Sequence, residues 1–191
     1  GEIFIKGMNI MDKIKIGFIG AGNMGSAIMN GIAGSKLSTE ISLSAFDPDA
    51  AKLQKLEELG IKGCKCEKEI MQSCKYVFLA VKPQVIEGIL ETVAPFTTED
   101  TVFVSIAAGI SDEFVQSKTI KNAKVILVMP NTPLLLGEGA SALSHSNEVS
   151  DEEFDVVLNI FKICGKAAVI SKDKMKEIIA GQLNVEASDI N

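Results

Sequence analysis

The stretch that decides the fold is KIGFIGAGNMG, residues 15–25. The apolar run Ile14–Ile19 predicts a short buried strand, and the apolar spacing of Asn23–Ala33 predicts a helix directly after it. A G-x-G-x-x-G turn joins the two. The order of strand, glycine turn and helix is typical of the first unit of a sheet that binds a dinucleotide.

Each glycine of this turn has a physical reason to be there. Gly20 permits the tight turn, Gly22 lets the backbone approach a pyrophosphate, and Gly25 lets the helix pack closely on the strand. N–H groups at the start of the helix then face the phosphates. The alternative is a glycine-rich turn that holds no ligand. The residues expected to contact the phosphates are Gly20, Ala21, Gly22, Asn23, Met24 and Gly25.

Asp47 follows the second expected strand, Ile41–Phe46, and stands twenty-two residues after Gly25. A carboxylate at this point accepts hydrogen bonds from the adenosine ribose of NAD and repels a 2′-phosphate. The sequence therefore favours NADH over NADPH, with Lys52 as a nearby cation that would offset part of the repulsion. The alternative is that the segment from Asp47 to Asp49 only caps the next helix.

The rest of the chain alternates strands and helices. The other expected strands are Ile61–Cys64, Tyr76–Val81, Val102–Ile106, Val125–Met129, Ala140–Leu143 and Ala167–Ile170. The other expected helices are Asp49–Leu59, Lys68–Ser73, Gln84–Val93, one from Asp112 with Ser111 as N-cap, Asp151–Cys164 and one near Asp173–Ala180. This alternation predicts an α/β fold with a doubly wound, largely parallel sheet.

Composition narrows the class of protein. Of 191 residues, 47% are hydrophobic and 23% charged, and 19 Lys+Arg against 25 Asp+Glu give a net charge of −6. An acidic chain without a basic patch is not expected to bind nucleic acid or an anionic membrane surface. No apolar run is long enough to span a bilayer. These features favour a globular protein of the cytoplasm.

The cysteines and the histidine are expected to be structural. Cys64, Cys66, Cys74 and Cys164 form no C-x-x-C pair, so we expect free thiols and no metal site. His145 has no catalytic partner nearby in the sequence and is expected to be structural or exposed.

Three further segments follow expected strands, at the sheet edge where doubly wound folds bind ligands. They are residues 80–84 (AVKPQ), 105–110 (SIAAGI) and 129–133 (MPNTP). Pro83 restricts the backbone of Lys82, and the small residues 107–109 leave room for a flat nicotinamide ring. Taken singly, each segment is also explained as an ordinary turn. Together with the glycine loop, they favour a cofactor site.

These motifs, in their order and spacing, resemble pyrroline-5-carboxylate reductase. The resemblance rests on residues 18–25, 78–84, 105–110, 128–133 and 137–140, and it covers the chain from Lys13 to Met175. It implies a Rossmann-type fold and an oxidoreductase that transfers hydride from NADPH or NADH to the small-molecule imine 1-pyrroline-5-carboxylate. The product is L-proline, so the family serves proline biosynthesis.

The resemblance also implies site residues. Ala80, Val81, Lys82, Pro83, Ala107, Ala108 and Gly109 are expected to line the cofactor, and Asn131 to lie near the reacting centre and the cofactor. Lys82 and Asn131 are the expected catalytic residues, in positioning roles. Two positions depart from NADP-using members: Asp47, where Ser or a basic residue is common, and Glu67, where Asn is common. Both are expected at the cofactor.

The resemblance divides the chain into three parts. Residues 1–11 are expected to be an extension or expression remnant, 12–171 the Rossmann domain, and 172–191 the truncated start of a helical domain. In the family that domain opens with Ser-Gly-Ser-Gly-Pro-Ala-Tyr and forms the core of the homo-oligomer, whereas here Gln182-Leu183-Asn184-Val185 stands in its place. We therefore expect this chain to lack the dimer core of the family. The alternatives are another imine or β-hydroxyacid reductase, or a dinucleotide-binding module without catalysis.

Overall fold

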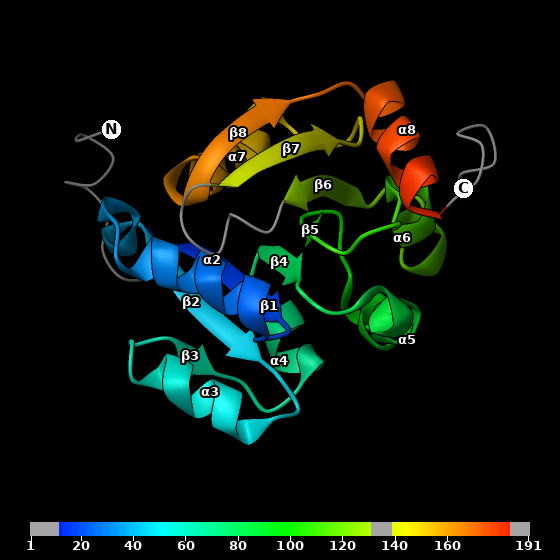
Figure 1. The fold of residues 1–191 in the computed structure, drawn as a ribbon. Coiled ribbons are helices and arrows are strands. Elements are labelled where there is room, and N and C mark those ends of the chain that lie inside the picture. Colours follow the sequence, from blue (N-terminus) through cyan, green and yellow to red (C-terminus); the bar gives the residue numbers. More distant parts are fainter. Residues whose placement is uncertain (1–11, 131–138, 184–191) are drawn as a thin grey trace.

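One eight-stranded sheet organises the chain (Figure 1). The computed structural model describes residues 12–130 and 139–183. The strands are β1 (Ile14–Ile19), β2 (Ile41–Phe46), β3 (Lys62–Gly63), β4 (Tyr76–Leu79), β5 (Val102–Ser105), β6 (Lys124–Pro130), β7 (Gly139–His145) and β8 (Gly165–Val169). Their order in the sheet is β3-β2-β1-β4-β5-β6-β7-β8, and every neighbouring pair is parallel except β6 with β7. The predicted doubly wound, largely parallel α/β sheet is confirmed.

Helices cover both faces of this sheet. They are α2 (Asn23–Ala33), α3 (Ala50–Glu57), α4 (Glu67–Ser73), α5 (Pro83–Val93), α6 (Asp112–Lys118), α7 (Asp151–Cys164) and α8 (Lys172–Leu183), with short 3₁₀ turns at Lys36–Thr39 and Ala94–Phe96. Buried side chains of α2 and α7 pack on one face, and those of α4, α5, α6 and α8 pack on the other. Within residues 12–130 and 139–183, no helix combines the length and the hydropathy of a membrane span.

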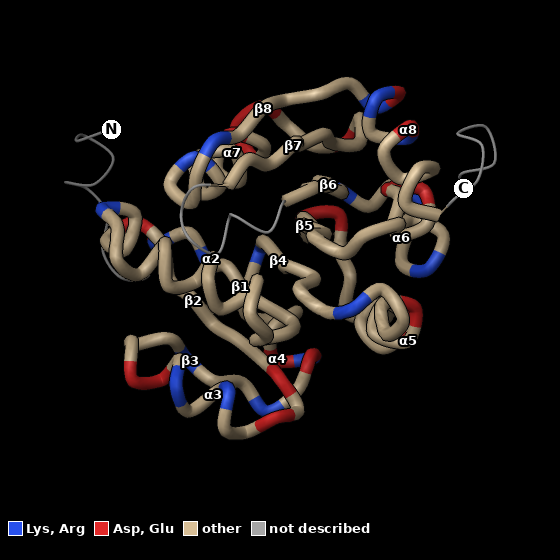
Figure 2. Tube along the Cα trace, viewed as in Figure 1, with Lys and Arg blue, Asp and Glu red and all other residues tan. Residues whose placement is uncertain are grey.

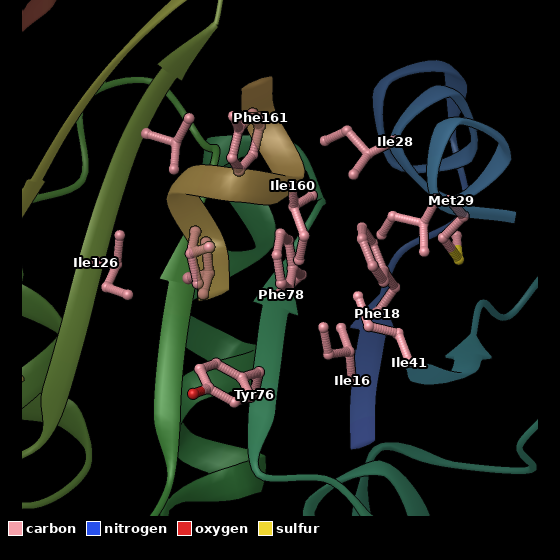
Figure 3. Packing of buried hydrophobic residues seen from close by; sticks show 14 of the residues in the cluster. Ile16, Phe18, Ile28, Met29, Ile41, Tyr76, Phe78, Ile126, Ile160 and Phe161 are labelled. Atoms are coloured by element: carbon pink, nitrogen blue, oxygen red, sulfur yellow. The ribbon is translucent and has the colours of Figure 1, made fainter. Parts of the chain in front are cut away.

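Aromatic rings hold the centre of the first face together. Phe18 of β1 stacks on Phe78 of β4 with ring centroids 4.4 Å apart, and Phe161 of α7 lies 6.2 Å from Phe78 (Figure 3). All three side chains are fully buried. Since these rings join two central strands to α7, they fix the strand ends that carry the candidate site.

Several predicted boundaries were wrong by a few residues. The predicted strand Tyr76–Val81 ends at Leu79, because its partners β1 and β5 end at the same level, so residues 80–82 form a loop. Pro83 does not precede its helix but begins it, at the position where a missing N–H does no harm. The predicted helix Asp49–Leu59 is shorter, with Asp49 as its N-cap.

Helix α8 packs into the core of the sheet domain. Met175 and Ile179 are buried in the same apolar cluster as Val125 and Leu127 of β6. The helix extends to Leu183, beyond the predicted range. Its last turn therefore comes close to the carboxyl ends of the central strands.

Candidate functional site

The glycine loop has the geometry that its sequence predicts. Gly20 has a φ of +106°, and a side chain there would overlap the carbonyl group of Ala80. A Cβ on Gly25 would come within 2.9 Å of the carbonyl oxygen of Gly20. A Cβ on Gly22 would meet nothing within 4 Å. Two of the glycines are thus required by the fold itself, whereas Gly22 faces open space that a ligand's phosphates would fit.

Asp47 ties this loop to the end of β2. Its Oδ2 accepts a hydrogen bond from the backbone N–H of Ala21, and its Oδ1 accepts one from that of Asp49, both at 2.8 Å. Asp49 itself caps α3 by accepting from Ala51. Capping is therefore not the task of Asp47. A carboxylate has about four acceptor positions, so two remain available for hydroxyl groups of a ligand.

Helices α2 and α5 both start beside the hollows, and no side chain accepts hydrogen bonds from the N–H groups of their first turns. Neither α2 nor α5 has a side-chain cap or an acidic residue in its first turn. By contrast, α7 has the Ser150 capping box and three acidic residues there. The positive ends of α2 and α5 are therefore suited to an anion.

Two hollows meet at the glycine loop. The first, of about 600 Å³, is lined by residues 21–23, Ser26, Asn30, Lys52, Lys55, Leu56, Leu59 and Lys82. The second, of about 370 Å³, is lined by residues 22–24, residues 80–82, Ile106, Ala108, Met129, Pro130 and Gln182. Gly22, Asn23 and Lys82 belong to both. An extended ligand can therefore bind across the glycine loop and occupy both hollows at once.

The first hollow is positively charged. Lys52 and Lys55 lie along α3, and Lys82 lies at the start of α5, where Figure 2 shows the basic positions. None of the three forms an ion pair within the part of the chain that the structure describes. No Asp or Glu is among the residues that line this hollow. In a chain of net charge −6, this local excess of cations favours an anionic ligand.

The other predicted site residues divide into those that line the second hollow and those that do not. Ala80, Val81, Lys82 and Ala108 line the second hollow, whereas Ala107 is buried beneath it in the core. Gly109 has a φ of +76° and donates its N–H to Gln182. Glu67 begins α4 and lines neither hollow. Asn131 lies outside the described residues.

Sequence reasoning missed several residues of the hollows, among them Lys55 and Gln182. Lys55 had a signal, since a position three residues after Lys52 shares its face of a helix. Gln182 had none, because its contact with Gly109 joins residues 73 positions apart.

A third hollow, of about 600 Å³, opens at the opposite edge of the sheet, beneath the start of α7. There Glu153 lies 2.9 Å from both Lys75 and Lys124. Burial alone would raise the pKa of Glu153, but the N–H of Ser150 and the two ammonium groups outweigh it and hold the pKa at about 2. Because these charges are already paired, the arrangement is structural.

Packing and local contacts account for the cysteine and histidine side chains. Cys64, Cys66, Cys74 and Cys164 are free, as predicted, and burial raises the pKa of the Cys164 thiol to about 11. His145 contacts the carbonyl oxygen of Ser146 and packs on Phe154, with ring centroids 4.7 Å apart. No acidic, thiol or imidazole cluster suited to a metal ion occurs within residues 12–130 and 139–183.

Comparison with known proteins bears on what the two hollows hold. Residues 15–109 match the family model described as NADP oxidoreductase, coenzyme F420-dependent. Pyrroline-5-carboxylate reductase of Escherichia coli strain K12 is 32% identical over 166 residues, which are 86% of this chain and 62% of that protein. Mouse pyrroline-5-carboxylate reductase 3 is 32% identical over 154 residues, 80% of this chain and 56% of that protein.

A solved structure agrees with these relatives. Plasmodium falciparum pyrroline carboxylate reductase, crystallised with NADP bound, superposes with a TM-score of 0.74 at 27% identity, over 90% of this chain and 63% of that one. This chain contains a domain similar to pyrroline-5-carboxylate reductase. The reductase-like domain spans about three fifths of the length of the relatives it matches.

Proposed function

We propose that the reductase-like domain binds a nicotinamide dinucleotide across the two hollows. The observation that carries this proposal is that both hollows share Gly22, Asn23 and Lys82. A dinucleotide has two nucleosides joined by a pyrophosphate, so it needs two recesses with an anion site between them. The free N-termini of α2 and α5 supply that anion site.

We assign the adenosine half to the first hollow. Asp47 does not line this hollow itself but is hydrogen-bonded to Ala21, which does. Its free acceptor positions suit the two ribose hydroxyls, and its charge disfavours a 2′-phosphate. Lys52 and Lys55 offset part of that charge. The expected outcome is binding of both cofactors with a preference for NADH. The predicted contact of Glu67 with the cofactor stays a proposal. It has less support than that of Asp47, because among the described residues Glu67 neither lines a hollow nor is hydrogen-bonded to a residue that does.

The nicotinamide half then lies in the second hollow, at the carboxyl ends of β4, β5 and β6. Small residues at 80 and 108 leave room for a flat ring beside Lys82. A bound reduced nicotinamide would supply a hydride to the imine carbon of 1-pyrroline-5-carboxylate, giving proline. The chain's own contribution is to align the ring, exclude water and keep the imine protonated, with Lys82 and Asn131 in positioning roles.

We further propose that residues 12–171 are the cofactor domain and that 172–191 begin the substrate domain, with its first helix, α8, packed against the cofactor domain. The 32% identity to the pyrroline-5-carboxylate reductase of Escherichia coli, over 86% of this chain, supports 1-pyrroline-5-carboxylate as the substrate. In that family the following helical domain binds the substrate carboxylate and forms the dimer core.

The acidic composition and the free thiols support a cytoplasmic location.

A substrate panel tests the proposed activity. The purified protein is incubated with NADH or NADPH and with 1-pyrroline-5-carboxylate, another cyclic imine or a β-hydroxyacid, and the change in cofactor absorbance is followed. The expected result is that 1-pyrroline-5-carboxylate gives the highest rate over background. A higher rate with the β-hydroxyacid would contradict the proposal, and so would a protein that binds neither cofactor.

A further inference from the structure

Gln182 is the polar side chain that α8 brings to the second hollow. It is exposed in the last turn of the helix, beside residues 107–109. Its Oε1 accepts a hydrogen bond from the N–H of Gly109 at 2.8 Å, and its Nε2 donates one to Sδ of Met129 at 2.7 Å. Since Met129 and Gln182 both line the second hollow, the side-chain amide forms part of its wall.

The position of this amide is fixed by packing. Met175 and Ile179 anchor α8 in the core, and Leu183 reaches so close to Gly109 that a Cβ there would lie 2.8 Å from its Cδ2. Gly109 is required by its positive φ, whereas the exposed tip of the Leu183 side chain can shift away from a Cβ. An amide held by a rigid helix on a conformationally restricted loop needs little reordering to meet a ligand.

The two hydrogen bonds of Gln182 are unequal. A backbone N–H is a strong donor, and its bond to Oε1 is well made. A thioether sulfur is a weak acceptor, and the second hydrogen of Nε2 has no partner among the described residues. The donor side of the amide is therefore available to any better acceptor that enters the second hollow.

We propose that Gln182 is a cofactor-binding residue that donates from Nε2 to the carboxamide oxygen of the nicotinamide. This inference rests on the proposed function, which places the nicotinamide in the second hollow. Oε1 keeps its bond to Gly109, while Nε2 exchanges the sulfur of Met129 for the carboxamide oxygen. The bond selects the nicotinamide end, so a ligand that lacks this ring does not make it.

Two variants separate the donor from a structural role. Gln182→Leu removes both hydrogen bonds, whereas Gln182→Glu keeps an acceptor for the N–H of Gly109 and removes the donor. Gln72→Leu, at an exposed position of α4 far from both hollows, is the matched control. The probes are NADH and ADP-ribose, which has no nicotinamide, and affinities are measured by titration calorimetry.

The expected result is that both Gln182 variants bind NADH about three- to tenfold more weakly, as loss of one neutral hydrogen bond implies. ADP-ribose binding should stay unchanged, and Gln72→Leu should match the wild type with both probes. Wild-type affinity for NADH in Gln182→Glu would overturn the donor role, and so would equal losses for NADH and ADP-ribose. If the wild type binds neither probe, the proposed function itself fails and this inference falls with it.

Discussion

Lys82 is the charged residue at which the two hollows meet. It precedes α5, its side chain is exposed, and it forms no ion pair within the described residues. Its ammonium group therefore contributes nothing visible to the packing of the fold. It is the N-cap residue of α5, and it lines both hollows together with Gly22, the N-cap residue of α2. A pyrophosphate bound there would need a counter-charge.

For Lys82→Ala we expect an unchanged fold and weaker dinucleotide binding. The melting temperature should stay within about 2 °C of the wild type, because no buried contact is lost. The affinity for NADH should fall about fivefold or more, as loss of a charge-assisted hydrogen bond implies. Lys121→Ala, at an exposed position away from both hollows, is the control. A variant that unfolds would show that Lys82 is structural.

Asp47 sets the expected cofactor preference. A negative charge beside a 2′-phosphate costs about 1 kcal/mol when partly desolvated, so NADH should bind about fivefold more tightly than NADPH. Asp47→Asn should remove that difference, at some loss of stability because one backbone N–H loses its acceptor. Asp49→Asn, which keeps a capping side chain on α3, should retain it. Tighter binding of NADPH by the wild type would contradict this assignment.

At the scale of residues, the sequence predicts features that depend only on neighbouring residues of the chain. The geometric tasks of Gly20 and Gly25 follow from motif spacing and are confirmed. The hydrogen bond from Ala21 to Asp47 did not follow, because it depends on how the glycine loop folds back on the end of β2. Gln182 was beyond prediction, since only tertiary packing brings α8 to β6.

Among the elements, α7 shows a built-in dependence on pH. Its N-terminal Glu153 is held by Ser150, Lys75 and Lys124, and its folded-state pKa of about 2 lies below the ordinary value of 4.5. A depressed carboxyl pKa stabilises the fold above the unfolded value, and that stabilisation is lost as pH falls towards the folded value.

We therefore expect the free energy of unfolding to decrease between about pH 4.5 and pH 2, by on the order of 2 kcal/mol after screening. Denaturant unfolding at several pH values measures it. Glu153→Gln should be less stable near neutral pH and should lose less stability across this window. Glu177→Gln, on an exposed ion pair of α8, should follow the wild type. Parallel curves for Glu153→Gln and wild type would refute the role given to Glu153.

Element boundaries were predictable where the chain carries its own stop signals. Helix α7 begins as predicted because the Ser150 capping box is encoded within four residues, and it ends as predicted before Gly165. Strand β4 was predicted two residues too long, because its end depends on pairing with β1 and β5. The antiparallel pairing of β6 with β7 left no mark in the apolar runs, since such a run does not encode strand direction.

At the scale of the molecule, a polypeptide of these 191 residues is expected to bind dinucleotide yet turn over 1-pyrroline-5-carboxylate slowly. The residues that line both hollows lie between 21 and 182, whereas the segment 182–185 differs from the family's carboxylate-binding signature. Alignment of two bound reactants supplies several kcal/mol of rate enhancement, and here one reactant would lack its anchor. Turnover on the order of 10 per second, typical of enzymes, would contradict this expectation.

The space beside Gly22 is expected to receive the ligand's phosphates, and one substitution tests this placement directly. Gly22 has a φ of −74° and a ψ of −166°, which alanine adopts without strain, and a Cβ there meets no protein atom within 4 Å. Gly88→Ala, in the exposed face of α5, is the matched control. Since the chain has no Trp, NADH emission can be titrated without a tryptophan background.

The measurement is the NADH dissociation constant of Gly22→Ala beside its melting temperature. We predict an unchanged melting temperature and a dissociation constant raised about tenfold or more, because the new methyl group occupies the space of the pyrophosphate. Gly88→Ala should bind NADH like the wild type. A folded Gly22→Ala protein with wild-type affinity would contradict the placement of the dinucleotide on the glycine loop.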